Sequence, residues 1–244
     1  MKFLNFFNLR TFLVLAISQI ATFIAIHYQI KFSLDLLLFG LAIGFPLAFS
    51  IQAAFKRRDR ALEYLSLFKA GTLALHHSFM VSKKLGTEAK AEATTLLSNV
   101  TDQVTSQLLQ RKVPFNTVQN KLDAVMDFIE KHREEISSRN IMRMIRYLKD
   151  ITESSAYLIS LINHRTMVGL RFYTFTFISL FPVLQAPIMV NKLYGDFPDW
   201  SIYALMALSG LILITLHNFQ KMIEYPFDPR GMDNIQVEDF KISR

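Results

Sequence analysis

Long apolar runs alternate with polar stretches along this chain of 244 residues. Four of these runs are long enough to form a helix that crosses a membrane, and they cover about residues 11–28, 34–55, 168–190 and 200–216. The hydrocarbon core of a bilayer is about 30 Å thick, and a helix of roughly 20 apolar residues spans it. The pattern predicts an all-α membrane protein with four transmembrane helices and a cytosolic helical domain.

The stretches between the runs predict how the helices are connected. Residues 29–33 and 191–199 are short, so the runs on either side of each should form an antiparallel hairpin. No convincing small-residue cleavage site follows the first run, which favours a retained span over a signal peptide. The expected regions are a membrane hairpin in residues 1–55, a cytosolic domain in 56–164, a second membrane hairpin in 165–218 and a cytosolic tail in 219–244.

The second apolar run continues into a basic stretch without a turn signal. Residues 34–55 are followed directly by the charged residues 56–60, with no Gly or Pro between them to end a helix. We expect this helix to run from Leu34 as far as Lys84, and some fifty residues at ~1.5 Å each make a rod of roughly 75 Å. A helix that lies half in the membrane and half in water is typical of channels and transporters rather than of enzymes.

The central residues 56–164 are polar overall, and their apolar residues recur at helical spacing. Gly86 and Pro114 separate the predicted helices, and Asn116 is a candidate N-cap. Each helix has one apolar stripe, so the helices should pack together, against neighbouring subunits, or both. The stripes contain Leu96, Leu97, Val100, Val104 and Leu108, then Phe115, Val118, Leu122, Val125, Met126 and Ile129, and then Ile141, Met144, Ile145, Leu148 and Ile151.

The charge distribution predicts the orientation of the spans. The chain has 27 Lys and Arg against 20 Asp and Glu, a net charge of +7, yet the two predicted outer connectors contain only Lys31 and Lys192. Both termini and the central region are therefore predicted to be cytoplasmic, in a bacterial inner membrane or its equivalent. Membrane flanking explains the basic charge, so we expect no nucleic-acid partner. The absence of Cys excludes disulfides and thiolate metal sites.

Three motifs, at residues 45–49, 163–166 and 223–228, resemble the bestrophin family of pentameric ion channels. Residues 45–49 (Phe-Pro-Leu-Ala-Phe), with the basic residues after them, resemble the family's pore-lining helix. Residues 163–166 (Asn-His-Arg-Thr), ahead of an aromatic run, are similar to the entry into its third span. Residues 223–228 (Ile-Glu-Tyr-Pro-Phe-Asp) resemble the Glu-Asn-Pro-Phe signature after the last span, with Tyr225 in place of Asn. The order and spacing match over most of the chain outside the central helices.

The resemblance implies a homopentamer around one central pore lined by the second span. Three apolar positions on that helix form a narrow neck in the family, and Phe45, Phe49 and Ala53 match them. A spacing of four residues places them on one helix face, and a ring of apolar side chains can gate by dewetting. Ala53 is smaller than the family's usual residue, so the cytosolic end of the neck should be wider. Alternatively, the two phenylalanines pack against the first and third spans.

Polar residues near the cytosolic end of this span are candidates to line the pore or its vestibule. They are Gln52, Lys56, Arg57 and Arg60. Repeated around a ring, the basic residues would concentrate anions, although one helix cannot point all of them at the lumen. Alternatively, they anchor the helix at the membrane surface and pair with Asp59 and Glu63. Pro46, within the span, removes one backbone hydrogen bond and leaves a carbonyl that a neighbour or water must meet.

The signature after the last span contains Glu224, Pro226 and Phe227. Pro226 should end the helix, and Phe227 should dock into the cytosolic domain. In animal bestrophins an acidic run after this signature binds calcium, but here residues 228–233 contain two Asp separated by an Arg. Separated carboxylates make a poor site for a hard cation, so we expect no calcium site of that type, no other metal and no cofactor. Without a phosphate loop or a nucleophile elbow, the sequence does not indicate an enzyme.

The predicted function is passive conduction of anions such as chloride through an oligomer, with membrane lipid and inorganic ions as the other partners. Some prokaryotic bestrophins conduct cations, so the sign of the permeant ion stays open. A rival function is a non-conducting membrane scaffold or sensor whose cytosolic helices recruit a partner. A secondary transporter ranks third, because it predicts inverted repeats and polar sites at the midplane of the membrane, and the sequence has no visible repeat.

Overall fold

The computed structural model describes residues 8–110, 114–164, 168–227 and 235–241, except the side chains of Leu36, Phe39, Val168, Leu170 and Arg171. In these ranges the chain is helical, and it has no strand beyond an isolated bridge between Tyr194 and Phe197. The predicted all-α fold is therefore confirmed. The helices belong to two compact units: unit 1 is residues 1–56 and 166–224, and unit 2 is residues 57–165 and 225–244.

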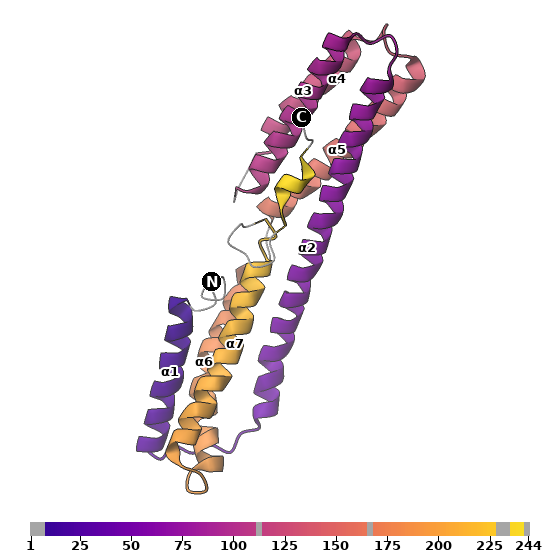
Figure 1. The fold of residues 1–244 in the computed structure, drawn as a ribbon. Coiled ribbons are helices and arrows are strands. Elements are labelled where there is room, and N and C mark those ends of the chain that lie inside the picture. Colours follow the sequence, from indigo (N-terminus) through magenta and orange to yellow (C-terminus); the bar gives the residue numbers. More distant parts are fainter. Residues whose placement is uncertain (1–7, 111–113, 165–167, 228–234, 242–244) are drawn as a thin grey trace. The chain divides into compact units, whose positions relative to one another are not determined.

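Unit 1 contains the apolar helices. They are α1 (Leu9–His27), the first part of α2 (Leu36–Val81), α6 (Val168–Leu193) and α7 (Asp199–Ile223). Helices α1, α6 and α7 pack pairwise against one another (Figure 1). One apolar cluster brings in α2 through Ile43, which packs with Val14, Ile178 and Ile214. Because α1 contacts both α6 and α7, the two predicted membrane hairpins share one interior.

The interior of unit 1 contains small and polar side chains beside its aliphatic ones. The Ser18 Oγ donates to the Met206 carbonyl oxygen at 2.9 Å, and the Asn218 Nδ2 donates to the Thr11 Oγ1 at 3.1 Å. The second apolar cluster of the unit includes Ala25 and Ala186. Small residues let membrane helices approach closely, and hydrogen bonds between such helices stabilise their association by about 0.6–2 kcal/mol each.

Three helical segments in the described ranges are long and apolar enough to cross a membrane. They are Leu9–His27, Phe172–Leu193 and Asp199–Ile223. The apolar part of α2 is not among them, and two side chains of its first turn, those of Leu36 and Phe39, lie outside the description. The count of four spans thus stays a prediction.

Helix α2 is a single helix of 46 residues, about 69 Å long, and belongs to both units. It begins at Leu36 rather than Leu34 because the Asp35 Oδ1 accepts a hydrogen bond from the Leu37 backbone N–H at 2.9 Å, as an N-cap does. It ends at Val81, three residues before the predicted limit at Lys84. The predicted continuity through residues 56–60 is confirmed.

Unit 2 has a conventional large apolar core. The rest of α2, α3 (Thr87–Leu108), α4 (Asn116–Lys131) and α5 (Ser138–Asn163) surround it. Most residues of the predicted apolar stripes belong to this core or pack against it, but Met126 and Ile145 are exposed. The N-cap prediction was one residue off: Phe115 occupies that position, and Asn116 is the first residue of α4.

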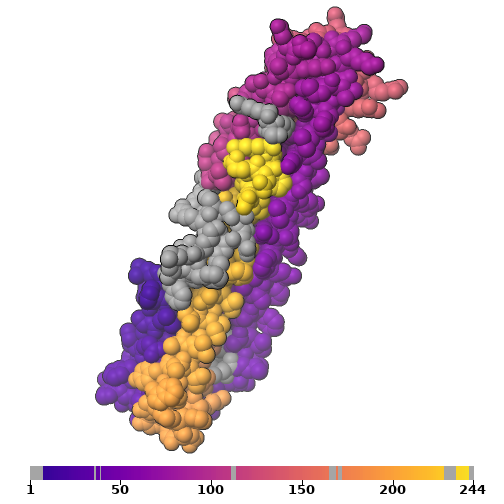
Figure 2. All heavy atoms as spheres, viewed as in Figure 1, coloured from indigo at the N-terminus to yellow at the C-terminus, as the bar shows by residue number. Residues whose placement is uncertain are grey.

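A short 3₁₀ helix, η2 (Val237–Phe240), returns the chain to unit 2 after α7. It lies against α3, where it is drawn in yellow in Figure 2. Val237 is buried in the core, the Lys69 Nζ donates to the Asp239 carbonyl oxygen at 2.6 Å, and Lys241 pairs with Asp102 at 3.7 Å. These contacts fix the segment to α2 and α3.

Candidate functional site: the exposed face of α2

Phe45 and Phe49 lie side by side on the surface of α2. Their rings stack with centroids 6.2 Å apart, and the two residues are 56% and 63% exposed in the single chain. The alternative interpretation required both rings to pack between α2 and its neighbouring helices. In the single chain they do not. Two large aromatic residues that stay exposed within an apolar unit are available to contact lipid, another subunit or a lumen.

The two sides of α2 in unit 1 differ in burial. Ile43, Leu47 and Ala54 are almost fully buried. The opposite side presents an apolar stripe that we call the α2 outer face, made of Leu38, Leu41, Phe45 and Phe49, all of them exposed. Because residues three or four apart share a helix face, the apolar positions in this part of α2 form two faces, of which the single chain buries only one.

The α2 outer face turns polar towards the start of unit 2. Gln52, Ala53 and Lys56 are exposed and follow Phe49 at helical spacing. Ala53 adds only a methyl group to this surface, so any ring formed by repeated copies would be wider there than at Phe49. The side chain of Gln52 lies on the same exposed side. The roles of Gln52 and Ala53 in lining a pore stay predictions.

The two arginines among the vestibule candidates have contacts within the chain. The Arg57 Nη1 donates to the His164 carbonyl oxygen at 2.8 Å, at the C-terminal end of α5, where a cation is favourable for the helix dipole. Arg60 pairs with Glu63 at 3.5 Å, and both side chains are more than half exposed. The first contact holds Arg57 towards α5, and the second is the kind of surface pairing that the alternative interpretation predicted.

The carbonyl left over by Pro46 has a partner. Pro46 has no N–H to offer the carbonyl of Ala42, four residues earlier, and the Tyr173 hydroxyl of α6 donates to that oxygen at 3.3 Å. Of the two partners expected, a neighbour or water, the neighbouring helix α6 supplies the donor. Gly44, close to Pro46, faces open space, because a Cβ added there would have no atom within 4 Å.

The signature after α7 is divided between the two units along the chain, because unit 1 ends at Glu224 and unit 2 resumes at Tyr225. Glu224 is buried as the residue that caps α7, while Phe227 is buried in the core of unit 2 with Ile235. The Pro226 carbonyl oxygen accepts a hydrogen bond from the Ile235 N–H at 2.8 Å. The predicted docking of Phe227 is confirmed.

The candidate metal chemistry lies mostly outside the description. Residues 228–233, including Asp228 and Asp233, are not described, so the prediction about a calcium site there stays a prediction. Among the residues that are described, no group of three His, Asp or Glu side chains could hold a metal ion.

Sequence reasoning missed the polar side chains that join the helices of unit 1. Thr11, Ser18 and Thr22 are all buried on one side of α1. Their spacing of seven and four residues within an apolar run was a visible signal, because small polar residues in a span usually face other helices.

The sequence matches no protein-family model and no curated protein at a significant level. Solved structures do match the fold. A crystal structure of a bacterial bestrophin homologue from Klebsiella pneumoniae has a TM-score of 0.78 and 16% identity, covering 95% of this chain and 93% of that one. A crystal structure of a point mutant of the Klebsiella pneumoniae homologue gives a TM-score of 0.77 with the same identity and coverage. A crystal structure of a membrane protein that carries one substitution gives 0.76, with 16% identity and 95% and 92% coverage. The chain therefore has a bestrophin-like fold.

Proposed function

We propose that this protein is an oligomeric ion channel whose pore is lined by the α2 outer face. The observation that carries the proposal is the stacked, exposed pair Phe45 and Phe49 on a helix of the apolar unit. Copies arranged around an axis would bring these rings together as an apolar neck, which can gate by dewetting. The bestrophin-like fold supports this arrangement, because the family resemblance implies five copies around one pore.

Four spans per subunit, with both termini and unit 2 in the cytoplasm, complete the proposal. Three segments already meet the length and composition of a span, and the apolar half of α2 is the fourth. We place the protein in a bacterial inner membrane or its equivalent. Because the chain has no Cys, single Cys residues at Asp196 and Ser137 would report opposite sides of the membrane with an impermeant thiol reagent.

Anions such as chloride are the proposed permeant ions. Exposed Lys56, below Phe49 on the same side of α2, would repeat as a ring of positive charge and raise the local anion concentration. Arg60 contributes less, because Glu63 offsets its charge. Cation conduction is the alternative, and we propose no enzymatic activity.

Reconstitution into planar bilayers tests the proposal. We expect discrete single-channel currents, a reversal potential that follows the chloride gradient, and a changed current amplitude in Phe49→Ala. Phe55→Ala is the matched control. Phe55 is on the same helix, but its ring packs edge-on against the Phe219 ring, with centroids 6.2 Å apart. Silent oligomers of both wild type and Phe49→Ala would favour the non-conducting scaffold instead.

A further inference from the structure

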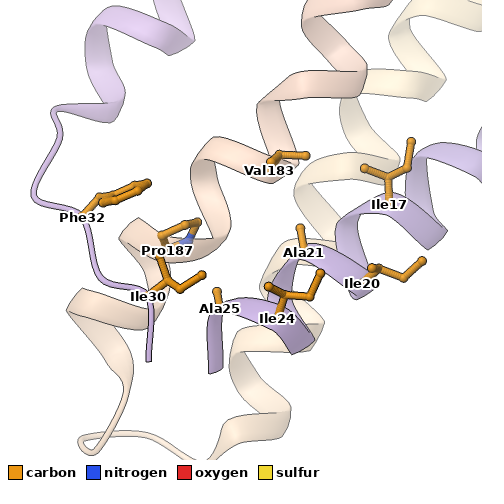
Figure 3. Close-up of a pocket in the computed structure, with 9 residues that line it drawn as sticks. All are labelled: Ile17, Ile20, Ala21, Ile24, Ala25, Ile30, Phe32, Val183 and Pro187. Carbon is orange, nitrogen blue, oxygen red and sulfur yellow. The ribbon is translucent and has the colours of Figure 1, made fainter. Parts of the chain in front are cut away.

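Unit 1 contains an apolar groove on the side formed by α1, α6 and the connector between α1 and α2. Its volume is about 360 Å³, within the range of small-molecule sites. Figure 3 shows Ile17, Ile20 and Ile24 of α1 along one wall, with Phe32 of the connector and Pro187 of α6 on the other side. All the residues that line the groove are apolar, so its occupant must be a hydrocarbon chain or a similar apolar group.

The connector is held in place, so the groove is preformed. The Ile30 backbone N–H donates to the Ala25 carbonyl oxygen at 3.0 Å, and the Asn191 Nδ2 of α6 donates to the Phe32 carbonyl oxygen at 3.3 Å. Ala21 and Ala25 line the groove beside larger isoleucines, and their methyl groups leave the space open. A site whose walls are fixed before binding loses less entropy when a chain enters.

Aromatic residues show which end of the groove lies at the membrane surface. Tyr28 and Trp200 are about 70% exposed, and both lie where the helices of unit 1 meet the two short connectors. Trp and Tyr collect at the level of lipid headgroups. From Ala25 to Ile17 the groove follows α1 for about 12 Å, which is close to one leaflet of a hydrocarbon core about 30 Å thick.

A cation lies at that same end. Lys31 sits in the chain between two residues that line the groove, and its Nζ lies 5.4 Å from the centre of the Tyr194 ring. It makes no ion pair within the described ranges, and the nearby Asp35 instead caps α2. Lys31 thus has a cation–π contact but no ion pair in the part of the chain that the structure describes, and its ammonium, on the connector that borders the apolar groove, complements a molecule with a negative headgroup and a hydrocarbon tail.

We propose that this groove binds an anionic phospholipid, with one acyl chain beside Ala21 and Ile24 and the phosphate at Lys31. The proposal depends on unit 1 spanning a membrane, as the proposed function also requires, but it does not depend on conduction. A lipid held here would tie α1 to α6 at the outer end of the unit.

Native mass spectrometry of protein from nanodiscs with equal parts phosphatidylglycerol and phosphatidylcholine tests the proposal. We expect wild type to retain about one phosphatidylglycerol per subunit. In Ala21→Phe the amount of retained phosphatidylglycerol should fall at least tenfold, because the ring fills the groove. Lys31→Gln should keep lipid but lower the preference for phosphatidylglycerol about fivefold. Ala16→Phe is the matched control, since Ala16 is exposed on α1 outside the groove.

Equal lipid retention in Ala21→Phe and Ala16→Phe would overturn the proposal. So would an unchanged lipid preference in Lys31→Gln, or disulfide-linked dimers of Ala21→Cys, which would identify a second copy as the occupant. If Ala21→Phe fails to fold, Ile24→Gln replaces it as a test of chain binding. Bilayer currents from the same preparations separate the two proposals, since a silent protein that retains phosphatidylglycerol contradicts only the channel.

Discussion

Units 1 and 2 differ in how much large apolar surface they expose. Unit 1 exposes Phe45 and Phe49 among many other large apolar side chains, whereas unit 2 gathers most of its own, such as Phe68 and Phe79, in one core; both units also bury some Ser and Thr. The surface of unit 2 holds exposed ion pairs, such as that of Arg133 with Glu130 at 2.8 Å. Burial of apolar surface drives folding only where the surroundings are water, so the comparison indicates that unit 1 has a different solvent.

The largest test of this contrast compares one phenylalanine from each unit. Phe79 is fully buried and meets the Phe128 ring edge-on at 5.5 Å, so Phe79→Ala should lower the free energy of unfolding by about 3–5 kcal/mol. Phe45→Ala removes an equally large but exposed ring and should change it by less than about 1 kcal/mol. Chemical denaturation in detergent measures both, and similar losses would show that Phe45 belongs to a packed core.

Two glycines of α2 test the same contrast at backbone level. A Cβ at Gly71 would lie 3.1 Å from the Ile151 Cγ1 in the core of unit 2, while a Cβ at Gly44 would meet open space. Overpacking a core costs about 1–3 kcal/mol, whereas Ala in a helix gains about 1 kcal/mol over Gly. We expect Gly71→Ala to lower the melting temperature and Gly44→Ala to raise it slightly. A loss in Gly44→Ala would identify a contact between subunits at that position.

Tyr173→Phe tests the hydrogen bond from α6 that compensates for Pro46. Removing the hydroxyl leaves the Ala42 carbonyl without this donor, and we expect a loss of about 0.6 kcal/mol, the average for hydrogen bonds between membrane helices. Thermal unfolding in detergent provides the measurement. The double variant Tyr173→Phe with Pro46→Ala should recover stability, because Ala restores the missing N–H. No recovery would mean that the hydroxyl has another role.

The smallest expected effect is the response of unit 2 to acid. Burial, followed by the neighbouring His77, lowers the pKa of His76 below its ordinary value of 6.5. The unfolded chain then binds a proton that the folded chain does not bind, so stability should fall as pH drops below 6.5. His76→Gln should flatten this dependence in unfolding measured from pH 7 to pH 5. If stability depends on pH as steeply in His76→Gln as in wild type, other groups cause the dependence.

Sequence periodicity predicted the helices well where each helix buries one apolar face and exposes the other, as in unit 2. It ended the last span at Leu216, but α7 continues to Ile223, because the polar residues His217, Asn218 and Gln220 are buried against other helices rather than exposed. The end of an apolar run therefore does not mark the end of the helix, which continues where polar side chains are buried.

Features that need distant segments were out of reach of the sequence. The partner of the Ala42 carbonyl lies 131 residues away on α6, and the groove beside Ala21 exists only because three separate segments fail to fill the space between them. The exposure of Phe45 and Phe49 followed from the resemblance and not from periodicity, which cannot tell which of two apolar faces a chain leaves uncovered.

The return of Phe227 and Val237 to the core of unit 2 has a consequence for biosynthesis. Residues 57–165 leave the ribosome first, yet the apolar side chains that complete their core follow α7. At synthesis rates of about 5–20 residues per second, some 60 intervening residues delay completion by several seconds. During that interval the apolar surface that later accepts Phe227 is uncovered, so maturation of unit 2 has to wait until α6 and α7 have been synthesised.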